Sequence, residues 1–286
     1  MAWFLLRIHT EGTAGSRGGY YFEKRGSGMS KSVAMGVDIG STSCKAVVLE
    51  NGEILGKVVI PTGTGTSGPR RVVEAVLNQT GLGPEDVAKT VATGYGRLQF
   101  AEADKQVSEI SCHGRGIHYL MPSVRTIIDI GGQDAKAIRL NDAGKVFNFV
   151  MNDKCAAGTG RFLDVIARVL ELETAQLAEY SARASQPVSI SSTCTVFAES
   201  EVISHLASGI PLENIVRGIH DSVARRVSGL AQRLGVAPDV AMSGGVALNA
   251  GVVQAMSEQL GLPVQVHPDC QLAGALGAAL YAADLL

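Results

Sequence analysis

The chain has 286 residues, of which 46% are hydrophobic and 18% charged, and its formal net charge at pH 7 is −2. This composition predicts one large or two ordinary globular domains and excludes an intrinsically disordered chain. The small net charge gives no general electrostatic basis for binding nucleic acid or an anionic membrane. No run of 18 apolar residues and no secretory signal pattern occurs, so we expect no membrane span and a cytoplasmic location.

Residues 1–34 differ from the remainder because they are polar, rich in Gly and Ser, and without apolar periodicity. We predict that they form a disordered or non-native N-terminal extension, with Met29 or Met35 as the natural start. From residue 35 onward, short apolar runs alternate with turns and with helical periodicity. That alternation is typical of an α/β fold.

The first structured unit predicted by the pattern is strand, tight turn, strand, hairpin and strand over residues 35–60. Asn51-Gly52 stands between two apolar runs, which is the strongest short hairpin signal. The elements expected next are a helix over 70–81, a strand over 90–97 and a helix over 109–122.

The strand–turn–strand unit recurs later in the chain. Residues 38–45 (DIGSTSCK) and 129–136 (DIGGQDAK) share the frame D-I-G-x-x-x-x-K. An internal repeat of this kind predicts two similar α/β domains that face one another. We expect these domains over 35–125 and 126–271, with a C-terminal helix over 272–286 that packs back on the first.

Each copy of the repeat ends a strand in Asp-Ile-Gly. The turn places a carboxylate, Asp38 or Asp129, at the strand end and leaves backbone N–H groups open to an anion. Two such turns from facing domains would clamp the β- and γ-phosphates of a nucleotide, with the carboxylates addressing a hydrated Mg²⁺. The first copy adds hydroxyl donors and a positive charge through Ser41, Thr42, Ser43 and Lys45.

A tight hairpin whose Asp caps its own turn is the alternative, and for one copy alone it would be preferred. A third element, MSGGVALN at 242–249, favours a nucleotide. There a strand ends in Gly244-Gly245 and a helix is expected to start at once, so backbone can approach a flat ligand and a helix N-terminus can face a phosphate. No GxxxxGK[ST] sequence occurs, which excludes a P-loop ATPase, and the Gly-rich segment 63–68 is predicted to be a loop.

The five cysteines include no CxxC pair, which argues against a disulfide framework and against a self-contained zinc site. Buried structural thiols are expected at Cys44, Cys112 and Cys270. Cys155 and Cys194 each precede a predicted helix, whose N-terminus would favour a thiolate. Taken alone, each could be a nucleophile, a phosphate-loop residue, a metal ligand or a buried thiol. If both are ligands of a four-thiolate [4Fe–4S] cluster, a twofold dimer would supply the other two.

The two repeats, MSGGVALN and the segment GALGAAL at 274–280 together resemble the motifs of the actin, Hsp70 and sugar-kinase ATPase superfamily. MNDKCAAGTGRFLDVIARVLEL and ISSTCTVFAESEVISHLASG are similar to segments of the ATP-dependent activators of 2-hydroxyacyl-CoA dehydratases. These belong, with the ATPase subunits of benzoyl-CoA reductase, to the BadF/BadG/BcrA/BcrD-type ATPase family. The resemblance implies a duplicated α/β ATPase fold in which two facing domains with mixed sheets enclose a nucleotide cleft.

The resemblance further implies an ATP-hydrolysing, one-electron donor to a dehydratase component, reduced by ferredoxin or flavodoxin. It implies a homodimer with one bridging [4Fe–4S] cluster held by Cys155 and Cys194 of each copy. Asp38 and Asp129 are implied as catalytic carboxylates acting with ATP, ADP and Mg²⁺. The implied nucleotide-binding residues are Gly40, Ser41, Thr42, Ser43, Cys44, Lys45, Gly131, Gly132, Gln133, Gly244, Gly245 and Gln271. Cys44 departs from the family pattern, which expects a small residue there.

Three other functions stay open at this point. The chain could be the ATPase subunit of a benzoyl-CoA-type reductase, a sugar or acetate-type kinase of the same superfamily, or a non-enzymatic Hsp70-like or actin-like module. Glu199 and Glu201, one turn after Cys194, could activate water, while His113 and His205 are expected to be structural.

Overall fold

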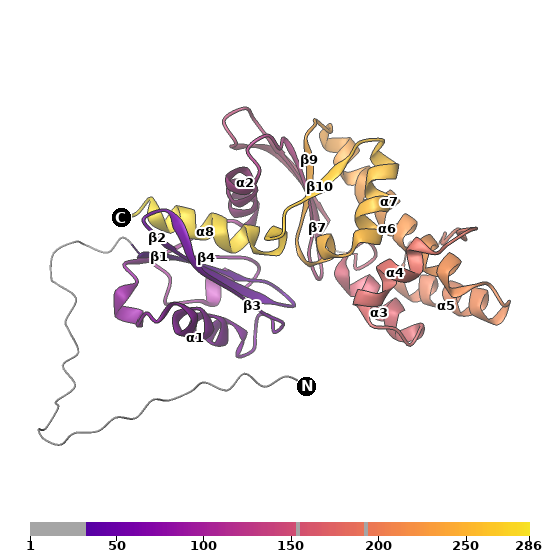
Figure 1. The fold of residues 1–286 in the computed structure, drawn as a ribbon, viewed down its shortest axis with the longest axis horizontal. Coiled ribbons are helices and arrows are strands. Elements are labelled where there is room, and N and C mark those ends of the chain that lie inside the picture. Colours follow the sequence, from indigo (N-terminus) through magenta and orange to yellow (C-terminus); the bar gives the residue numbers. More distant parts are fainter. Residues whose placement is uncertain (1–32, 153–154, 192–193) are drawn as a thin grey trace, which may run out of the picture. The chain divides into compact units, whose positions relative to one another are not determined.

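The computed structural model describes residues 33–152, 155–191 and 194–286. The predicted N-terminal extension therefore lies outside the described residues, except that Val33 and Ala34 already belong to the first strand. The described chain forms two mixed five-stranded sheets with helices packed on them (Figure 1). This is the α/β architecture that the sequence predicted.

The first sheet has the strand order β3-β2-β1-β4-β5. Its strands are β1 (Val33–Ile39), β2 (Cys44–Glu50), β3 (Glu53–Ile60), β4 (Lys89–Thr93) and β5 (Lys105–Gln106). The first three pair antiparallel, and Asn51 and Gly52 form the expected hairpin with φ of 53° and 86°. The strand predicted over 90–97 ends at Thr93, because Gly94 turns the chain with φ of 85°. The two-residue β5 carried no sequence signal.

The second sheet repeats this arrangement with the strand order β8-β7-β6-β9-β10. Its strands are β6 (Thr126–Ile130), β7 (Ala135–Leu140), β8 (Val146–Asn152), β9 (Val240–Ser243) and β10 (Val264–Val266). In both sheets the central strand has an antiparallel partner on one side and a parallel partner on the other. The repeated sequence frame therefore corresponds to a repeated piece of sheet.

Helices cover both sheets. The α-helices are α1 (Gly68–Thr80), α2 (Glu109–Leu120), α3 (Gly160–Val169), α4 (Leu177–Ala182), α5 (Thr195–Ala207), α6 (Leu212–Leu234), α7 (Ala250–Leu260) and α8 (Ala273–Ala283). Short 3-10 helices are η1 (Pro84–Asp86), η2 (Arg97–Gln99), η3 (Thr174–Gln176), η4 (Gly245–Leu248) and η5 (Cys270–Leu272). α1 packs on β2 and β3, whereas α6 packs on β7 and β8 of the second sheet.

The C-terminal helix α8 lies against β1 and also against α2, which in turn contacts the second sheet. Glycine makes this packing close. A Cβ on Gly36 of β1 would lie 2.1 Å from the carbonyl oxygen of Ala275. A Cβ on Gly277 of α8 would lie 1.9 Å from the carbonyl oxygen of Cys112 in α2. The Ala- and Gly-rich sequence of α8 thus lets three backbones approach to distances that larger side chains would prevent.

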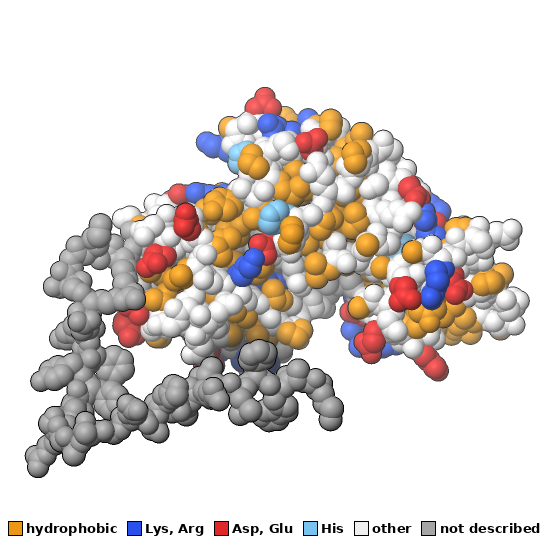
Figure 2. All heavy atoms as spheres, in the orientation of Figure 1, with side chains coloured by type: hydrophobic (Ala, Val, Ile, Leu, Met, Phe, Trp, Pro, Cys, Tyr) orange, Lys and Arg blue, Asp and Glu red, His pale blue; other side chains and the backbone are white. Residues whose placement is uncertain are grey.

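None of the helices in the described ranges is long and apolar enough to span a membrane. On the face shown in Figure 2, acidic and basic side chains are interspersed, without a continuous basic stripe. This face therefore offers no electrostatic footprint of the kind that nucleic-acid-binding proteins carry.

We predict that Gly36→Ala lowers the free energy of unfolding by about 1–3 kcal/mol or more, since the new methyl group meets backbone that has to shift. Gly229→Ala is the matched control, because Gly229 lies inside α6 and the added Cβ would meet no atom within 4 Å beyond its chain neighbours and the backbone of its own helix. That control should stabilise the protein by up to about 1 kcal/mol through helix propensity. Urea unfolding of both variants checks the prediction, and equal effects would contradict the packing argument.

Candidate functional site

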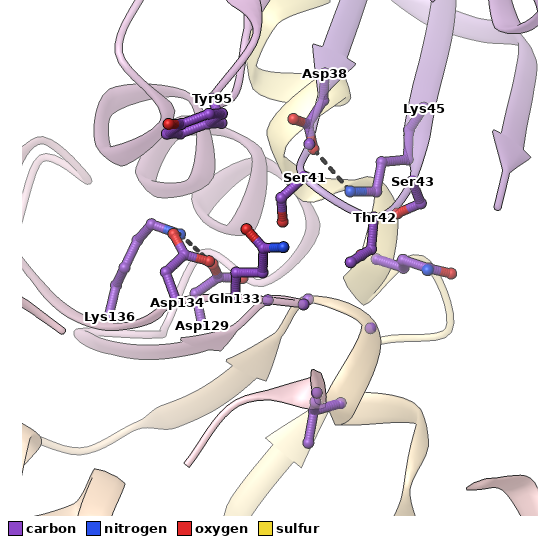
Figure 3. Close-up of a pocket in the computed structure, with 18 of the residues that line it drawn as sticks. Asp38, Ser41, Thr42, Ser43, Lys45, Tyr95, Asp129, Gln133, Asp134 and Lys136 are labelled. Carbon is purple, nitrogen blue, oxygen red and sulfur yellow. Dashed lines mark hydrogen bonds and ion pairs between the residues drawn. The ribbon is translucent and has the colours of Figure 1, made fainter. Parts of the chain in front are cut away.

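A cavity of about 380 Å³ lies where the turn after β1 faces the turn after β6 (Figure 3). The Gly-Gly segment after β9 also lines it, so three segments far apart in sequence converge there. The lining includes both predicted catalytic carboxylates, Asp38 and Asp129. It also includes the predicted nucleotide residues Gly40, Ser41, Thr42, Ser43, Lys45, Gly131, Gly132, Gln133, Gly244, Gly245 and Gln271.

Each Asp-Ile-Gly turn carries a carboxylate–lysine pair. In the antiparallel register of β1 and β2, Asp38 lies directly opposite Lys45, and in that of β6 and β7, Asp129 lies directly opposite Lys136. Opposite residues share one face of a sheet, so each lysine reaches its carboxylate. The Nζ to Oδ2 distances are 3.2 Å for Lys45–Asp38 and 3.1 Å for Lys136–Asp129. The seven-residue spacing of the repeated frame thus fixes an ion pair at each phosphate turn.

Asp129 is the more enclosed of the two carboxylates, with 2% of its surface exposed. Ser243 donates a hydrogen bond of 2.8 Å to Oδ1, and His113 Nδ1 lies 3.2 Å from the same oxygen. Burial by itself raises the pKa of Asp129, but His113, Lys136 and the hydrogen bonds from Ser243 and Lys136 outweigh it. The net effect holds the pKa of this carboxyl well below its usual range, so Asp129 stays ionised at neutral pH.

The buried ammonium of Lys136 has three carboxylates around it. Its Nζ lies 3.1 Å from Asp129, 2.5 Å from Asp134 and 3.7 Å from Glu109. Burial alone would lower the pKa of Lys136, but these carboxylates raise it above its ordinary value. This side of the cavity is therefore a compact charged cluster centred on one cation.

The two turns touch. A Cβ placed on Gly132 would lie 2.3 Å from Oγ1 of Thr42, so only glycine leaves room for the opposing turn. Figure 3 shows the Asp38–Lys45 pair and the Lys136 cluster on opposite sides of the cavity, with Ser41 and Gln133 between them. A ligand held here would contact both sheets at once.

The third element differs from its sequence prediction in one respect. After β9, Gly244 turns the chain with φ of 83°, and a Cβ there would lie 2.4 Å from the carbonyl oxygen of Ile130. A 3-10 helix follows at once, but α7 begins only at Ala250. The Asn249 side chain accepts hydrogen bonds from the first amides of α7, Gly251 and Val252. The N-terminus of α7 is thus capped by Asn249 and is not open to a phosphate as predicted. The backbone of Gly244 and Gly245 lines the cavity in its place.

Cys44 does not line the cavity, so it is removed from the nucleotide-binding residues, and the expected buried structural thiol is confirmed. It begins β2 with a fully buried side chain that packs in the hydrophobic core beneath α1. Burial raises the pKa of this thiol to about 11, with Asp38 contributing in the same direction. The side chain alternation of a strand explains the difference, because Lys45 points to the cavity and its neighbour to the core.

The other cysteines fall into two classes. Cys112 and Cys270 are fully buried, as expected, and burial raises the pKa of their thiols to about 12 and about 11. Cys194 is exposed and is the N-cap of α5, which confirms its predicted place at a helix N-terminus. Cys155 is partly exposed, but α3 begins only at Gly160 with Thr159 as N-cap. Its predicted place at the helix end is wrong, since a turn at Ala156–Thr159 intervenes.

Two backbone hydrogen bonds join α3 to the second phosphate turn. The N–H of Gly160 donates to the carbonyl of Gly131 at 2.9 Å, and the N–H of Arg161 donates to the carbonyl of Gly132 at 2.8 Å. The segment after Cys155 is therefore anchored to a turn that lines the cavity.

Sequence reasoning missed several cavity residues. Lys136 is the last residue of the second D-I-G-x-x-x-x-K repeat, at the position that Lys45 has in the first, so the repeat itself could have identified it. Ser243 is fully buried and does not line the cavity, but it donates to Asp129 and directly precedes the predicted Gly-Gly turn. Glu109 and His113 project from α2 into the cavity, although Glu109 was given no role and His113 was expected to be structural. Glu199 and Glu201 lie on α5, and Glu201 accepts hydrogen bonds from the backbone and hydroxyl of Ser191. Neither is among the residues lining the cavity.

Two facing sheets that each present an Asp-Ile-Gly turn to one cavity define the class of protein as an actin-, Hsp70- and sugar-kinase-type ATPase fold. A glucokinase of the ROK family from Streptomyces griseus shares this fold with a TM-score of 0.52 over 88% of this chain and 99% of that chain, at 13% identity. Residues 35–282 match the BadF/BadG/BcrA/BcrD ATPase family. The chain belongs to this family of ATPases.

Its relatives in the family are similar over nearly their whole length. The 2-hydroxyisocaproyl-CoA dehydratase activator of Clostridioides difficile is 57% identical over 87% of this chain and 94% of that protein. The activator of lactoyl-CoA dehydratase of Anaerotignum propionicum is 58% identical over 87% and 96%. A solved structure of the activator of the 2-hydroxyisocaproyl-CoA dehydratase from Clostridium difficile, with bound ADPNP, is similar to this chain with a TM-score of 0.87 at 56% identity. The similarity covers 88% of this chain and 95% of that chain.

We predict that Lys136→Met destabilises the fold by about 3–5 kcal/mol at pH 7, because it leaves the buried carboxylate of Asp129 without its ammonium partner. The pKa of Asp129 is lower in the folded protein than in the unfolded chain. The ion pair therefore contributes its full stability when the pH is above the unfolded pKa, and this contribution is lost as the pH falls through the folded pKa. The difference between wild type and variant should therefore shrink below about pH 4. Urea unfolding at pH 7 and at about pH 2.5, well below the unfolded pKa, checks this, with exposed Lys145→Met as control. A deficit that does not change with pH would contradict the electrostatic cause.

Proposed function

We propose that this chain is the ATP-hydrolysing activator of a 2-hydroxyacyl-CoA dehydratase, which passes single electrons to the dehydratase from a [4Fe–4S] cluster shared by two copies. The observation that carries the proposal is the similarity to dehydratase activators over nearly their whole length. The thiols and the cavity described above supply the chemistry that such an activator needs.

The nucleotide site is the cavity between the two Asp-Ile-Gly turns. Both carboxylates are already paired with lysine, so Asp38 and Asp129 would hold Mg²⁺ through its water shell, the usual manner of this strongly hydrated ion. Lys45, the hydroxyls of Ser41 to Ser43 and the amides of both turns then face the phosphates of ATP or ADP. We infer that domains over 35–125, with the C-terminal helix, and 126–271 close on the nucleotide from both sides.

Cys155 and Cys194 fit a cluster site better than the other thiols do. They are the two cysteines that are not fully buried, and small residues, Ala156 to Gly158, follow Cys155. Among the described residues, no group of three or more His, Cys, Asp or Glu side chains converges to hold a metal. Two thiols supply half of a four-thiolate set, so a second copy related by a twofold axis would complete it. When bound, the cluster supplies a one-electron carrier.

We infer the partners from the resemblance to the dehydratase activators. A ferredoxin or flavodoxin loses one electron to the homodimer, and the dehydratase component gains that electron from it. Hydrolysis of ATP gives the transfer a direction only if the nucleotide state changes the surroundings of the thiols. The hydrogen bonds from Gly160 and Arg161 to Gly131 and Gly132 are a direct route for that change. We place this electron transfer in the cytoplasm.

Two alternatives are less well supported. The relatives at 57% and 58% identity are both named as dehydratase activators, which favours this function over that of a benzoyl-CoA reductase ATPase subunit. The likeness to a glucokinase, at 13% identity, concerns the fold alone. A colourless protein that phosphorylates a small substrate would favour the kinase.

The iron content of the anaerobically purified protein tests the cluster assignment. We expect about four irons per dimer and a reduced-cluster EPR signal with dithionite. Cys155→Ala and Cys194→Ala should each lose the signal and most of the iron, because a four-thiolate site loses two ligands per dimer. Cys270→Ala is the control, since that thiol is buried in the core, and it should keep both. Full iron in the Cys155 and Cys194 variants, or a stable cluster in a monomer, would refute the shared site.

The link between α3 and the phosphate turn can be cut selectively. Gly160 is the first residue of α3, where proline is tolerated, and the extended Thr159 suits a residue before proline. Gly160→Pro removes the N–H that donates to Gly131, whereas Gly160→Ala keeps it. We expect dehydratase activation by the proline variant to fall by about tenfold or more and to fall further than its ATP hydrolysis, which also declines because Gly160 lines the cavity. Parallel loss of both activities, or of neither, would contradict the route.

A further inference from the structure

ATP hydrolysis is accelerated by a residue that orients the attacking water or takes its proton. Five carboxylates line the cavity: Asp38, Glu109, Asp129, Asp134 and Asp164. A carboxylate bonded directly to an ammonium is a poor proton acceptor, because protonation destroys the ion pair. The contacts of each group therefore decide which one can act as a base.

Three of the five are bonded directly to lysine. Asp38 is paired with Lys45 at 3.2 Å, and Asp129 and Asp134 share Lys136 at 3.1 and 2.5 Å. Asp129 is additionally held ionised by Ser243 and His113. These carboxylates can fix charges and orient waters around the phosphates, but they are poorly suited to accept a proton.

Asp164 has a different partner and a different location. It lies on α3, and the hydroxyl of Thr174 donates a hydrogen bond to it at 3.2 Å. It therefore stands on the wall formed by α3 and η3, where this hydrogen bond directs its carboxylate to Thr174.

Glu109 is the remaining candidate, and its surroundings differ. It is the first residue of α2, after the N-cap Ser108, and α2 is wedged between α8 and the second sheet. Its Oε1 stands 3.7 Å from Lys136 Nζ, which is longer than a direct hydrogen bond, and 22% of its side chain is exposed. The carboxylate is thus close enough to Lys136 to be oriented by it and open enough to contact water in the cavity.

The groups facing Glu109 come from three elements. They are Lys136 of β7, Asp129 of β6, Asp134 of the turn between these strands, and His113 of α2 itself. Burial, with support from Asp134 and Asp129, raises the pKa of Glu109, whereas Lys136 and His113 oppose the shift. The net direction is upward, towards the range in which a carboxylate is an effective base near neutral pH.

We propose that Glu109 is the proton acceptor in ATP hydrolysis, with Lys136 as the residue that positions it. The water oxygen forms a bond to the γ-phosphorus as the bond from that phosphorus to the β,γ-bridging oxygen breaks. The water proton passes to the Glu109 carboxylate, and ADP and phosphate are the products. Glu109 then releases the proton to solvent through its exposed edge. The inference rests on the nucleotide part of the proposed function and does not depend on the cluster.

Glu109→Gln tests this, because it keeps the shape and removes the basic oxygen. In the anaerobically purified dimer we expect single-turnover hydrolysis to fall by about 10²-fold or more, while the Kd for ADPNP stays within about threefold. Glu109→Asp keeps a carboxylate and should retain intermediate activity. The control is Glu53→Gln in β3, an exposed residue with the same change of charge, which should hydrolyse ATP at the wild-type rate.

The pH profile separates proton transfer from a structural role. At saturating ATP, the wild-type rate should fall on the acid side with an apparent pKa above the ordinary glutamate value of about 4.5, because the base must be ionised. Glu109→Gln should lack this acid limb. A variant that merely disturbs the site would keep the limb at a lower rate.

Wild-type hydrolysis in Glu109→Gln, or an equal loss of hydrolysis and ADPNP binding, would overturn the proposal. If Glu109→Gln does not fold, the Glu109→Asp variant decides. Its shorter side chain moves the carboxylate away from the water, so an unchanged rate and an unchanged acid limb in this variant would also overturn the proposal. If the wild-type protein itself neither binds nor hydrolyses ATP, the proposed function fails instead.

Discussion

The charge pairing of an aspartate with a lysine across a hairpin is the interaction on which the site depends. It occurs twice, as Asp38–Lys45 and Asp129–Lys136, because the repeated frame puts the partners directly opposite in antiparallel register. Two strands ending in acidic turns would repel one another and the phosphates of a ligand. Each lysine offsets that repulsion, so the two turns can approach until Thr42 meets Gly132.

The close approach of backbones around α8 gives the pairs their relative position. At its contacts with β1 and α2, α8 approaches so closely that only glycine fits, so the position of this helix is fixed. α2 then carries Glu109 and His113 to the Lys136 cluster from an element that belongs to neither phosphate turn. The nucleotide pocket is therefore a product of helix packing as much as of the two hairpins.

A short segment of backbone connects the cavity with the segments that carry Cys155 and Cys194. The second phosphate turn faces the cavity with one side, and with its carbonyls it holds the first amides of α3. Cys155 precedes that helix by a single turn, and Cys194 caps α5, which packs against α3. In the proposed function, a change in phosphate contacts at Gly131 and Gly132 would reach the cysteine segments through these two hydrogen bonds.

The sequence alone determined the α/β class, the duplicated strand–turn–strand unit and most residues of the cavity, because short-range spacing sets hairpin register and the side chain period of a strand. It also separated Cys155 and Cys194 from three buried thiols by their context. It placed three local details wrongly: Cys44 points to the core because strand side chains alternate, α7 is capped by Asn249, and α3 starts a turn after Cys155. No role in the cavity was predicted for Glu109 or His113, since only the packing of α2 between α8 and the second sheet brings them to Lys136.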